Sequence, residues 1–538
     1  MLWRYAHECA RSITATVVVI SGMSVAPQAR AQGTATGDLL ILTSGTDTIA
    51  LERVRRGPRR LDGDLLLKGA NARFTYSIEL DEQGGASRLR NAFRPASASA
   101  ESPALQEAVV HFSSDSAIAD IAGGGRTVTQ RFATEAHVLP FINPSFAQVE
   151  LMIQRARVMG GDSAEVPIWM IQGGGTTTAQ VVRRGADSVV VTLGAVAVRL
   201  AVNSAGDIVG GTVPAQGLRL SRTGGGDARA MQVEPPDYSP PPYAPYSAEE
   251  VVVRTPAGHT LAGTLTMPRG AARPVPAVVT ISGSGPEDRD EAIPPVKGYR
   301  PFRQVADTLG RHGIAVLRVD DRGYGASTGS SATATTADFA DDIRAALAYL
   351  RTRADIDPTR LALVGHSEGG MIAPMVAASD PALRGIVLLA GTAHTGRTIL
   401  RYQLRQGIVR APALSATQRD SALRTVDAMI DSLGRAQPWV RYFLEYDPLV
   451  TARKVRVPTL ILQGETDRQV TPEQAEALER ALRAGGNQHV TRRMFPQTNH
   501  LFVQDADGNP AGYAALPDHQ VRAEVLAAML AWLRTTLR

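Results

Sequence analysis

The chain has 538 residues, 44% of them hydrophobic, so it is long enough for several domains with sizeable cores. Its formal net charge is only +5 and it has no long basic run, which argues against a nucleic-acid-binding role. Its only cysteine is Cys9, so the rest of the chain cannot hold a disulfide, a cysteine nucleophile or a thiolate metal site.

The N-terminus has the pattern of an export signal. Arg4 and Arg11 precede or flank an apolar stretch at 13–26, and the tripeptide ARA at 29–31 fits a cleavage site. We therefore predict that residues 1–31 are a signal peptide and that the mature protein is periplasmic or secreted. The apolar stretch is shorter than the ~20 residues of a membrane span, so we expect no stable span after its removal; an uncleaved N-terminal anchor is the alternative.

Residues 32–232 read mainly as strands. Two alternating runs flank a Gly-Gly turn within 72–93, and a similar pattern with two further turns fills 176–213. Only 145–161 has apolar residues at helical spacing, with Gly160 as a stop signal. We predict a β-rich N-terminal domain, an antiparallel sheet or partial barrel against one helix, without a recognisable catalytic cluster.

The stretch EPPDYSPPPYAPY at 234–246 is too rich in proline for a helix or a central strand. It predicts a stiff, extended linker over 233–248. Beyond it, from 249 to 538, strands and helices alternate. The expected strands are a hairpin at 250–268, then 275–285, 314–327, 360–367, 383–391, 457–467 and 489–496, and the expected helices are 302–313, 338–353, 368–379, 472–486 and 518–537.

Near-continuous apolar strands that alternate with helices predict an α/β fold with a mostly parallel sheet covered on both faces. Residues 392–454 interrupt this alternation with helical patterns. An insertion between two strands of such a sheet would lie over their carboxyl ends, where ligands bind. We therefore predict that about 392–454 form a cap.

The pentapeptide GHSEG at 365–369 lies where a strand gives way to a helix, which is the context of a nucleophile elbow. The flanking glycines allow the close backbone approach that this turn needs. The start of the following helix offers backbone N–H groups to a developing oxyanion. This context favours Ser367 as a nucleophile over an ordinary loop serine.

A nucleophilic serine needs a base, and the base needs an acid that orients it. In this fold the chain order is serine, acid, histidine. Asp467 and His500 each follow a predicted strand, in that order, and are our candidates. Glu465 and His519 are the rivals, whereas His366 lies inside the elbow, too close to Ser367 in the chain to act as its base.

An oxyanion hole needs one N–H from the residue after the nucleophile, here Glu368, and one from an earlier loop. The glycine-rich loop at 282–290 supplies the second; we choose Ser284, with Gly283 as the alternative. In the following loop, DDRGYGAS at 320–327, we expect a structural Asp–Arg salt bridge.

The motifs SGSGPEDRD, DDRGYGAS, GHSEGG, GETDRQV and NHLF occur in this order within 249–538. In them this region resembles the α/β-hydrolase superfamily, most closely bacterial serine esterases with an extra N-terminal β-rich domain. Many relatives begin the oxyanion loop with His-Gly, where this chain has Ser282-Gly283. The resemblance implies a Ser367–Asp467–His500 triad, no metal, no cofactor, and hydrolysis of a small-molecule carboxylic ester through an acyl-enzyme.

Two other functions remain open. A serine peptidase or aminopeptidase of the same fold would share the triad; the sequence shows no obvious carboxylate pair to bind a free amino terminus, and this favours the esterase. A non-catalytic envelope binding protein would suit the β-rich domain, but the complete serine, acid and histidine set argues against it. The sequence predicts no particular oligomeric state.

Overall fold

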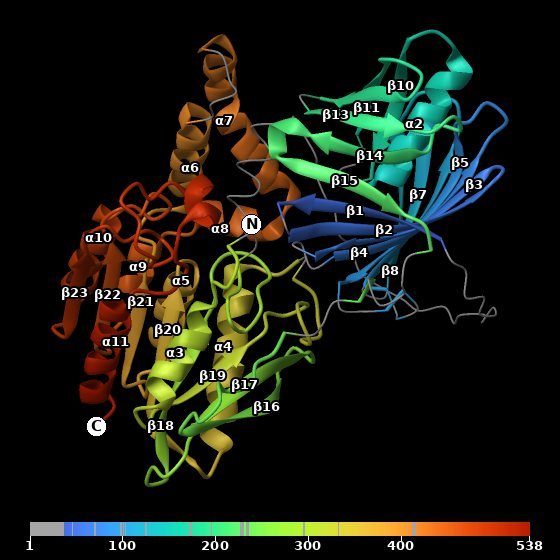
Figure 1. Cartoon of the computed structure of the whole chain (residues 1–538). Coiled ribbons are helices and arrows are strands. Elements are labelled where there is room, and N and C mark those ends of the chain that lie inside the picture. The colour runs from blue at the N-terminus through green and yellow to red at the C-terminus, as the bar shows by residue number, and fades with distance from the viewer. Residues whose placement is uncertain are drawn as a thin grey trace. The chain divides into compact units, whose positions relative to one another are not determined.

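The computed structural model describes residues 37–538 except 46, 69–71, 97–98, 101, 103, 124–125, 172–174, 195, 226–230, 233–235, 294–295, 332 and 411–415. The described residues form two compact units that divide between Pro236 and Asp237 (Figure 1). The predicted signal peptide lies outside the described residues. Among the helices of the described ranges, none is both long and apolar enough to cross a membrane.

The N-terminal unit is built on one sheet of fifteen strands. β1 lies in the middle, β2 to β8 follow in chain order on one side, and β15 back to β9 follow on the other. Neighbours are antiparallel, apart from the parallel pair β9–β10. The strands are β1 (Asp38–Ser44), β2 (Asp47–Gly57), β3 (Arg60–Leu67), β4 (Ala72–Leu80), β5 (Ala86–Pro95), β6 (Gln106–Phe112), β7 (Ser116–Gly123), β8 (Arg126–Ala133), β9 (Leu139–Phe141), β10 (Ser163–Met170), β11 (Thr176–Arg183), β12 (Ser188–Leu193), β13 (Val196–Val202), β14 (Ile208–Val213) and β15 (Leu218–Thr223).

One α-helix, α2 (Phe146–Met159), packs against this sheet with its apolar residues in the common core. The Ser145 hydroxyl caps its start by accepting a hydrogen bond from the N–H of Gln148 at 3.2 Å. The buried carboxyl group of Glu52 on β2 accepts hydrogen bonds from the Tyr76 hydroxyl at 2.6 Å and the Ala147 N–H at 3.0 Å. The β-rich region with one helix agrees with the sequence prediction.

The second unit holds a sheet of eight strands in the order β16-β17-β19-β18-β20-β21-β22-β23. The pairs β16–β17 and β17–β19 are antiparallel and the others parallel. The strands are β16 (Tyr246–Arg254), β17 (Thr260–Pro268), β18 (Val275–Ile281), β19 (Ala315–Val319), β20 (Ile356–His366), β21 (Gly385–Leu389), β22 (Thr459–Gly464) and β23 (Val490–Phe495).

Helices cover both faces of this sheet. Their apolar residues form two separate cores with the strands, one with α4, α5 and α10 and one with α3 and α11. The helices are α3 (Pro301–Gly310), α4 (Thr336–Thr352), α5 (Gly369–Ala377), α10 (Glu473–Ala484) and α11 (Ala523–Thr536). The strand order, the parallel pairs and the two covered faces confirm the predicted α/β-hydrolase fold.

The region after β21 contains the helices α6 (Gly396–Arg410), α7 (Ala416–Ala436), α8 (Pro438–Glu445) and α9 (Pro448–Ala452). Residues of α6, α7 and α8 share an apolar cluster of their own, which also takes in Met371 from the first turns of α5. Met371 lies four residues after the proposed nucleophile, so the predicted cap helices α6, α7 and α8 lie close to that turn.

The proline-rich segment differs from a free linker. From Asp237 onward it packs with the hydrolase unit, and Tyr246, within the stretch expected to be linker, already begins β16. The guanidinium group of Arg289 lies 4.2 Å from the centre of the Tyr238 ring. Tyr238 and Tyr246 supply contacts that a purely proline-rich spacer would lack, whereas Tyr243 is exposed.

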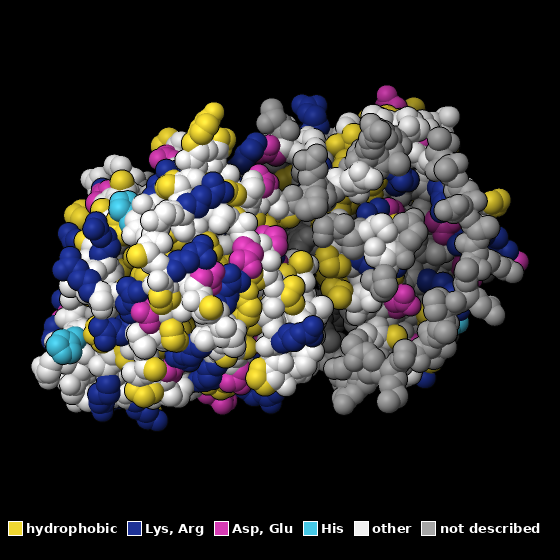
Figure 2. All heavy atoms as spheres, turned by 90° about the horizontal axis from the view of Figure 1, so that it is seen from below, with side chains coloured by type: hydrophobic (Ala, Val, Ile, Leu, Met, Phe, Trp, Pro, Cys, Tyr) yellow, Lys and Arg dark blue, Asp and Glu magenta, His cyan; other side chains and the backbone are white. Residues whose placement is uncertain are grey.

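Charged side chains are mixed on the surface of the hydrolase unit. Arg353 pairs with Glu249 and Arg351 with Asp380. On the face seen in Figure 2, Lys and Arg side chains are spread among Asp and Glu rather than gathered in one patch.

Candidate active site

Ser367 lies on a tight turn between β20 and α5. Its φ of +54° is in the left-handed region, which non-glycine residues rarely adopt. A Cβ atom at Gly365 would lie 2.1 Å from the carbonyl oxygen of Gly369, and one at Gly369 would lie 2.1 Å from that of Ile281. Glycine is therefore required on both sides, which is the local reason why this sequence forms a nucleophile elbow.

Asp467 and His500 follow β22 and β23, and the structure brings their side chains together. His500 Nδ1 lies 2.8 Å from Asp467 Oδ2, and both residues are buried. The other oxygen of Asp467 accepts hydrogen bonds from the N–H groups of Gln469 and Val470 at 2.8 and 2.9 Å. The carboxylate is therefore fixed in its orientation toward the imidazole.

The two rivals lie elsewhere. Glu465 is exposed to solvent. The ring nitrogens of His519 face the carbonyl oxygens of Lys297 and Tyr513, at 2.7 and 3.1 Å. Neither residue lines the cavity beside Ser367, where an alternative acid or base would have to act.

A cavity of about 120 Å³ connects the remaining candidates. Ser367, Glu368, His500 and Ser284 all line it, with Ile399 and Phe443 of the cap. Asp467 is not among its lining residues, since it lies behind His500. The five residues selected from the sequence thus meet at one place.

In the oxyanion loop after β18, one of the two candidate N–H donors is already hydrogen-bonded within the protein. The N–H group of Gly283 points at two carboxylates, 3.0 Å from Glu291 Oε1 and 3.2 Å from Glu287 Oε2. An N–H already bound in this way is a poor oxyanion donor, which favours Ser284. The N–H of Glu368 lies at the first turn of α5, where a helix leaves N–H groups without carbonyl partners and presents its positive dipole end.

The side chain of Glu368 has contacts that the sequence did not suggest. Its Oε1 accepts hydrogen bonds from Trp439 Nε1 on cap helix α8, at 2.8 Å, and from the Thr336 hydroxyl on α4, at 2.7 Å. Burial raises the pKa of this carboxyl group, and these contacts oppose the increase. The residue after the nucleophile therefore also connects the cap to the elbow.

Sequence reasoning missed a carboxylate pair. Glu287 and Glu291 both line the cavity beside Ser367, although the sequence made no such pair obvious. Burial, reinforced by Glu291 and Asp321, raises the pKa of Glu287 well above its usual range. The run PEDRDE at 286–291, in the second half of the oxyanion loop, was the signal that could have indicated them.

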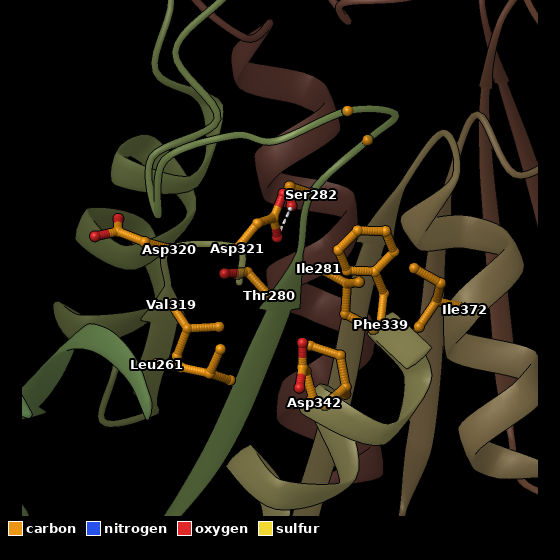
Figure 3. A pocket seen from close by; sticks show the side chains of 13 residues that line it. Leu261, Thr280, Ile281, Ser282, Val319, Asp320, Asp321, Phe339, Asp342 and Ile372 are labelled. Carbon is orange, nitrogen blue, oxygen red and sulfur yellow. Dashed lines mark hydrogen bonds between the residues drawn. The ribbon is translucent and has the colours of Figure 1, made fainter. Parts of the chain in front are cut away.

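Structural salt bridges do fix the DDRGYGAS loop, and their partners lie outside it. Asp320 pairs with Arg289 from the oxyanion loop, and Arg322 pairs with Asp342 on α4. Asp321 points to the other side, toward a small cavity of about 20 Å³, where it accepts a hydrogen bond from the Ser282 hydroxyl at 3.0 Å (Figure 3). Its second oxygen accepts the N–H of Glu287 at 2.9 Å. Asp321 thus holds the oxyanion loop at its first residue and again at Glu287.

Within the described residues, no group of three or more His, Cys, Asp or Glu side chains is arranged to hold a metal ion.

Comparison with known proteins agrees with this architecture. Residues 298–507 match the family model described as Hydrolase_4, serine aminopeptidase, S33. The chain is 29% identical to esterase EstD of Thermotoga maritima over 293 residues, which are 53% of this chain and 67% of the relative. It is 32% identical to an uncharacterized protein of Mycobacterium tuberculosis over 136 residues, 25% of this chain and 43% of that protein.

Solved structures were also found to be similar. The esterase Pf2001 of Pyrococcus furiosus has 16% sequence identity and a TM-score of 0.40, over 57% of this chain and 98% of its own. The esterase domain of a Rhodothermus marinus protein has 19% identity and a TM-score of 0.35, over 54% of this chain and all (100%) of its own.

The C-terminal unit thus has the fold that the motifs predicted, and its sequence is similar to a serine aminopeptidase family model and to an esterase.

Proposed function

We propose that this α/β-hydrolase is a serine carboxylesterase that acts through Ser367, Asp467 and His500. The main support is the 2.8 Å contact between His500 and Asp467 beside a serine held on a left-handed turn. The similarity to an esterase supports the same reaction class.

In the proposed mechanism, His500 Nε2 takes the proton of Ser367 as its Oγ attacks the ester carbonyl carbon. Asp467 accepts the hydrogen bond from Nδ1–H, selects this tautomer and stabilises the imidazolium. The N–H groups of Glu368 and Ser284 donate to the oxyanion of the tetrahedral intermediate. Collapse passes the proton to the departing alcohol and leaves an acyl ester on Ser367, which a water molecule activated by His500 then hydrolyses.

The size and lining of the cavity favour a short acyl chain. A cavity of about 120 Å³ accommodates a few carbon atoms, and the cap residues Ile399 and Phe443 provide apolar contacts. We therefore choose 4-nitrophenyl butyrate as the first substrate.

The decisive experiment compares the protein with its Ser367→Ala variant. We expect the variant to lose at least ~10³-fold in kcat on the butyrate ester and to resist labelling by a fluorophosphonate, with an unchanged far-UV spectrum. Undiminished hydrolysis by a cleanly purified variant would refute the assignment. Absence of labelling in the unsubstituted protein would favour the non-catalytic alternative.

An aminopeptidase is the second candidate, because Glu287 and Glu291 line the cavity and the matching family model is named for a serine aminopeptidase. The raised pKa of Glu287 weakens this interpretation, since a carboxyl group that resists ionisation attracts an ammonium group less strongly. An amino-acid 4-nitroanilide should be hydrolysed at least ~100-fold less efficiently than the butyrate ester. A preference for the anilide that Glu287→Gln abolishes would reverse the assignment.

We propose further that the enzyme is exported, on the basis of the signal pattern in residues 1–31. Expression in a Gram-negative host should yield a periplasmic or secreted product whose mass corresponds to a chain that begins at Gln32. A cytoplasmic product that retains residues 1–31 would contradict this.

A further inference from the structure

His366, the residue before the nucleophile, is buried, and both of its ring nitrogens are bonded. Nδ1 lies 2.6 Å from Glu291 Oε1, and Nε2 lies 2.9 Å from the main-chain carbonyl oxygen of His500. The rings of His366 and His500 are 4.8 Å apart between centres. The mechanism proposed above does not use this second acid–histidine pair.

The groups that face the two ring nitrogens of His366 determine how many protons His366 and Glu291 hold together. A carbonyl oxygen only accepts, so Nε2 must carry a hydrogen. On the other side, Nδ1 faces a carboxyl oxygen at hydrogen-bond distance, so one proton must lie between them. Whether that proton belongs to the ring or to the carboxyl group, the pair has a net charge of zero and holds two protons in all.

Glu291 extends the contact to a third segment. The same Oε1 atom accepts the N–H of Gly283 in the oxyanion loop at 3.0 Å. Glu291 is fully buried, and its φ of +56° is unusual for a residue with a side chain. One carboxyl oxygen is thereby linked to the oxyanion loop, to β20 beside the nucleophile and, through His366, to the loop that carries the catalytic base.

We propose that Glu291 and His366 form a positioning pair, which holds these three catalytic segments in register and requires its shared proton to do so. This rests on the proposed function, because it concerns the same site. The pair acts through the main chain of His500 and does not itself touch the substrate carbonyl.

Other charged and titratable groups surround the pair. They are Glu287 and Asp321 on neighbouring loops, Asp467 and His500 behind it, and the hydroxyl groups of Tyr299 and Tyr513. Burial lowers the pKa of His366, but Glu291, the carbonyl group of His500 and Asp467 together raise it above its ordinary value. The contacts at both ring nitrogens require the shared proton, and the raised pKa moves its loss toward higher pH.

Loss of that proton would place two acceptors 2.6 Å apart. They would repel, the ring would move, and the carbonyl group of His500 would lose its donor. Activity should therefore fall on the alkaline side in a way that depends on Glu291, in addition to any titration of His500 itself.

The experiment measures kcat and KM for 4-nitrophenyl butyrate from about pH 6 to about pH 10, corrected for spontaneous hydrolysis, on the full mature chain. Glu291→Gln is the key variant, because its amide group donates to Nδ1 without a titratable proton, while the N–H of Gly283, which loses Oε1 as an acceptor, keeps Glu287 Oε2. Glu287→Gln is the matched control, because Glu287 also accepts the N–H of Gly283 but has no contact with His366. His366→Phe removes both contacts of the ring.

We expect an alkaline decline in kcat for the unsubstituted enzyme and for Glu287→Gln, and no such decline for Glu291→Gln. At neutral pH, Glu291→Gln should keep kcat within about tenfold, whereas His366→Phe should lower kcat by about 10–100-fold with KM changed less than about threefold. If His366→Phe fails to fold, the Glu291→Gln profile decides.

Three results would overturn the positioning pair: no alkaline decline in the unsubstituted enzyme, a decline that persists in Glu291→Gln, or a His366→Phe effect confined to KM. If the unsubstituted enzyme hydrolyses no ester at any pH, the proposed function fails first. If it hydrolyses the ester but behaves in one of these three ways, only the positioning pair fails.

Discussion

Replacing Asp467 by Asn tests the proposed triad with almost no change in shape. One oxygen of Asp467 accepts two backbone N–H groups, from Gln469 and Val470, at 2.8 and 2.9 Å. The amide oxygen of an Asn must occupy that position, because an NH₂ group there would face two donors. Its NH₂ group then replaces the oxygen that now accepts from His500 Nδ1 at 2.8 Å and from Gln463 Nε2 at 3.0 Å, so the contact with Gln463 is lost as well.

The expected effect follows from this geometry. Nδ1 must accept from the amide, so the proton of the neutral ring moves to Nε2, the atom that should take the proton from Ser367. The base is then in the wrong tautomer, and the imidazolium also loses its counter-charge. We expect kcat to fall by about 10³–10⁴-fold, equivalent to about 4–5.5 kcal/mol of transition-state stabilisation, with KM nearly unchanged.

The assay is steady-state hydrolysis of 4-nitrophenyl butyrate at neutral pH, with the thermal unfolding midpoint as a check on folding. Glu465→Gln is the matched control, because it neutralises the neighbouring exposed acid, and it should retain full activity. If kcat falls by less than tenfold in Asp467→Asn, or falls equally in Glu465→Gln, the acid has been assigned incorrectly.

Three further outcomes are expected. Trp439→Phe keeps the aromatic ring but removes the N–H donated to Glu368, and it should lower kcat on the ester by about 5–10-fold, the value of one hydrogen bond, in steady-state assays. Gly369→Ala places a methyl group 2.1 Å from a carbonyl oxygen and should lower kcat by at least ~100-fold. Gly407→Ala is the matched control on helix α6, where the new methyl group meets no other atom of the described residues; it should raise the free energy of unfolding, measured by urea denaturation, by about 0.5–1 kcal/mol. Burial raises the pKa of Asp321 on folding, so the folded chain keeps a proton that the unfolded chain loses above about pH 4, and the free energy of unfolding falls as pH rises. The Asp321→Asn variant lacks this titration, so its free energy of unfolding should increase relative to that of the unsubstituted protein by up to ~1.4 kcal/mol per pH unit above about pH 4. A difference between the two proteins that stays constant with pH would contradict this.

The fold of the C-terminal unit was predictable because its local and global signals agree. Buried parallel strands such as 361–364 and 386–389 are continuous apolar runs, and the helices between them have an apolar face. The end of a strand is less well determined by such patterns. Tyr246 begins β16 although it lies in a proline-rich stretch, because its pairing with Pro268 across the hairpin outweighs the local composition.

The proposed triad residues could be selected from the sequence because each candidate lies at a strand end and in the expected chain order. The residues that position them could not. Glu291 reaches His366 across 75 positions of the chain, and Trp439 reaches Glu368 across 71. Such contacts depend on how loops fold back over the sheet, and no periodic pattern in the sequence records that. The same reason explains why Asp320 pairs with Arg289 and Arg322 pairs with Asp342, since both partners lie outside the DDRGYGAS loop.

The site contains two histidines, each bonded to a carboxyl group through Nδ1, and what faces the other nitrogen separates their roles. Nε2 of His366 is held against a main-chain carbonyl oxygen, so it must keep its hydrogen and cannot accept a proton. His500 lines the cavity together with Ser367, which leaves its Nε2 as the acceptor the reaction needs. The histidine adjacent to the nucleophile in the chain is therefore unsuited to be the base, and the distant one is suited. Because the carbonyl oxygen that locks His366 belongs to His500, the same hydrogen bond that excludes one ring from proton transfer also holds the main chain of the other.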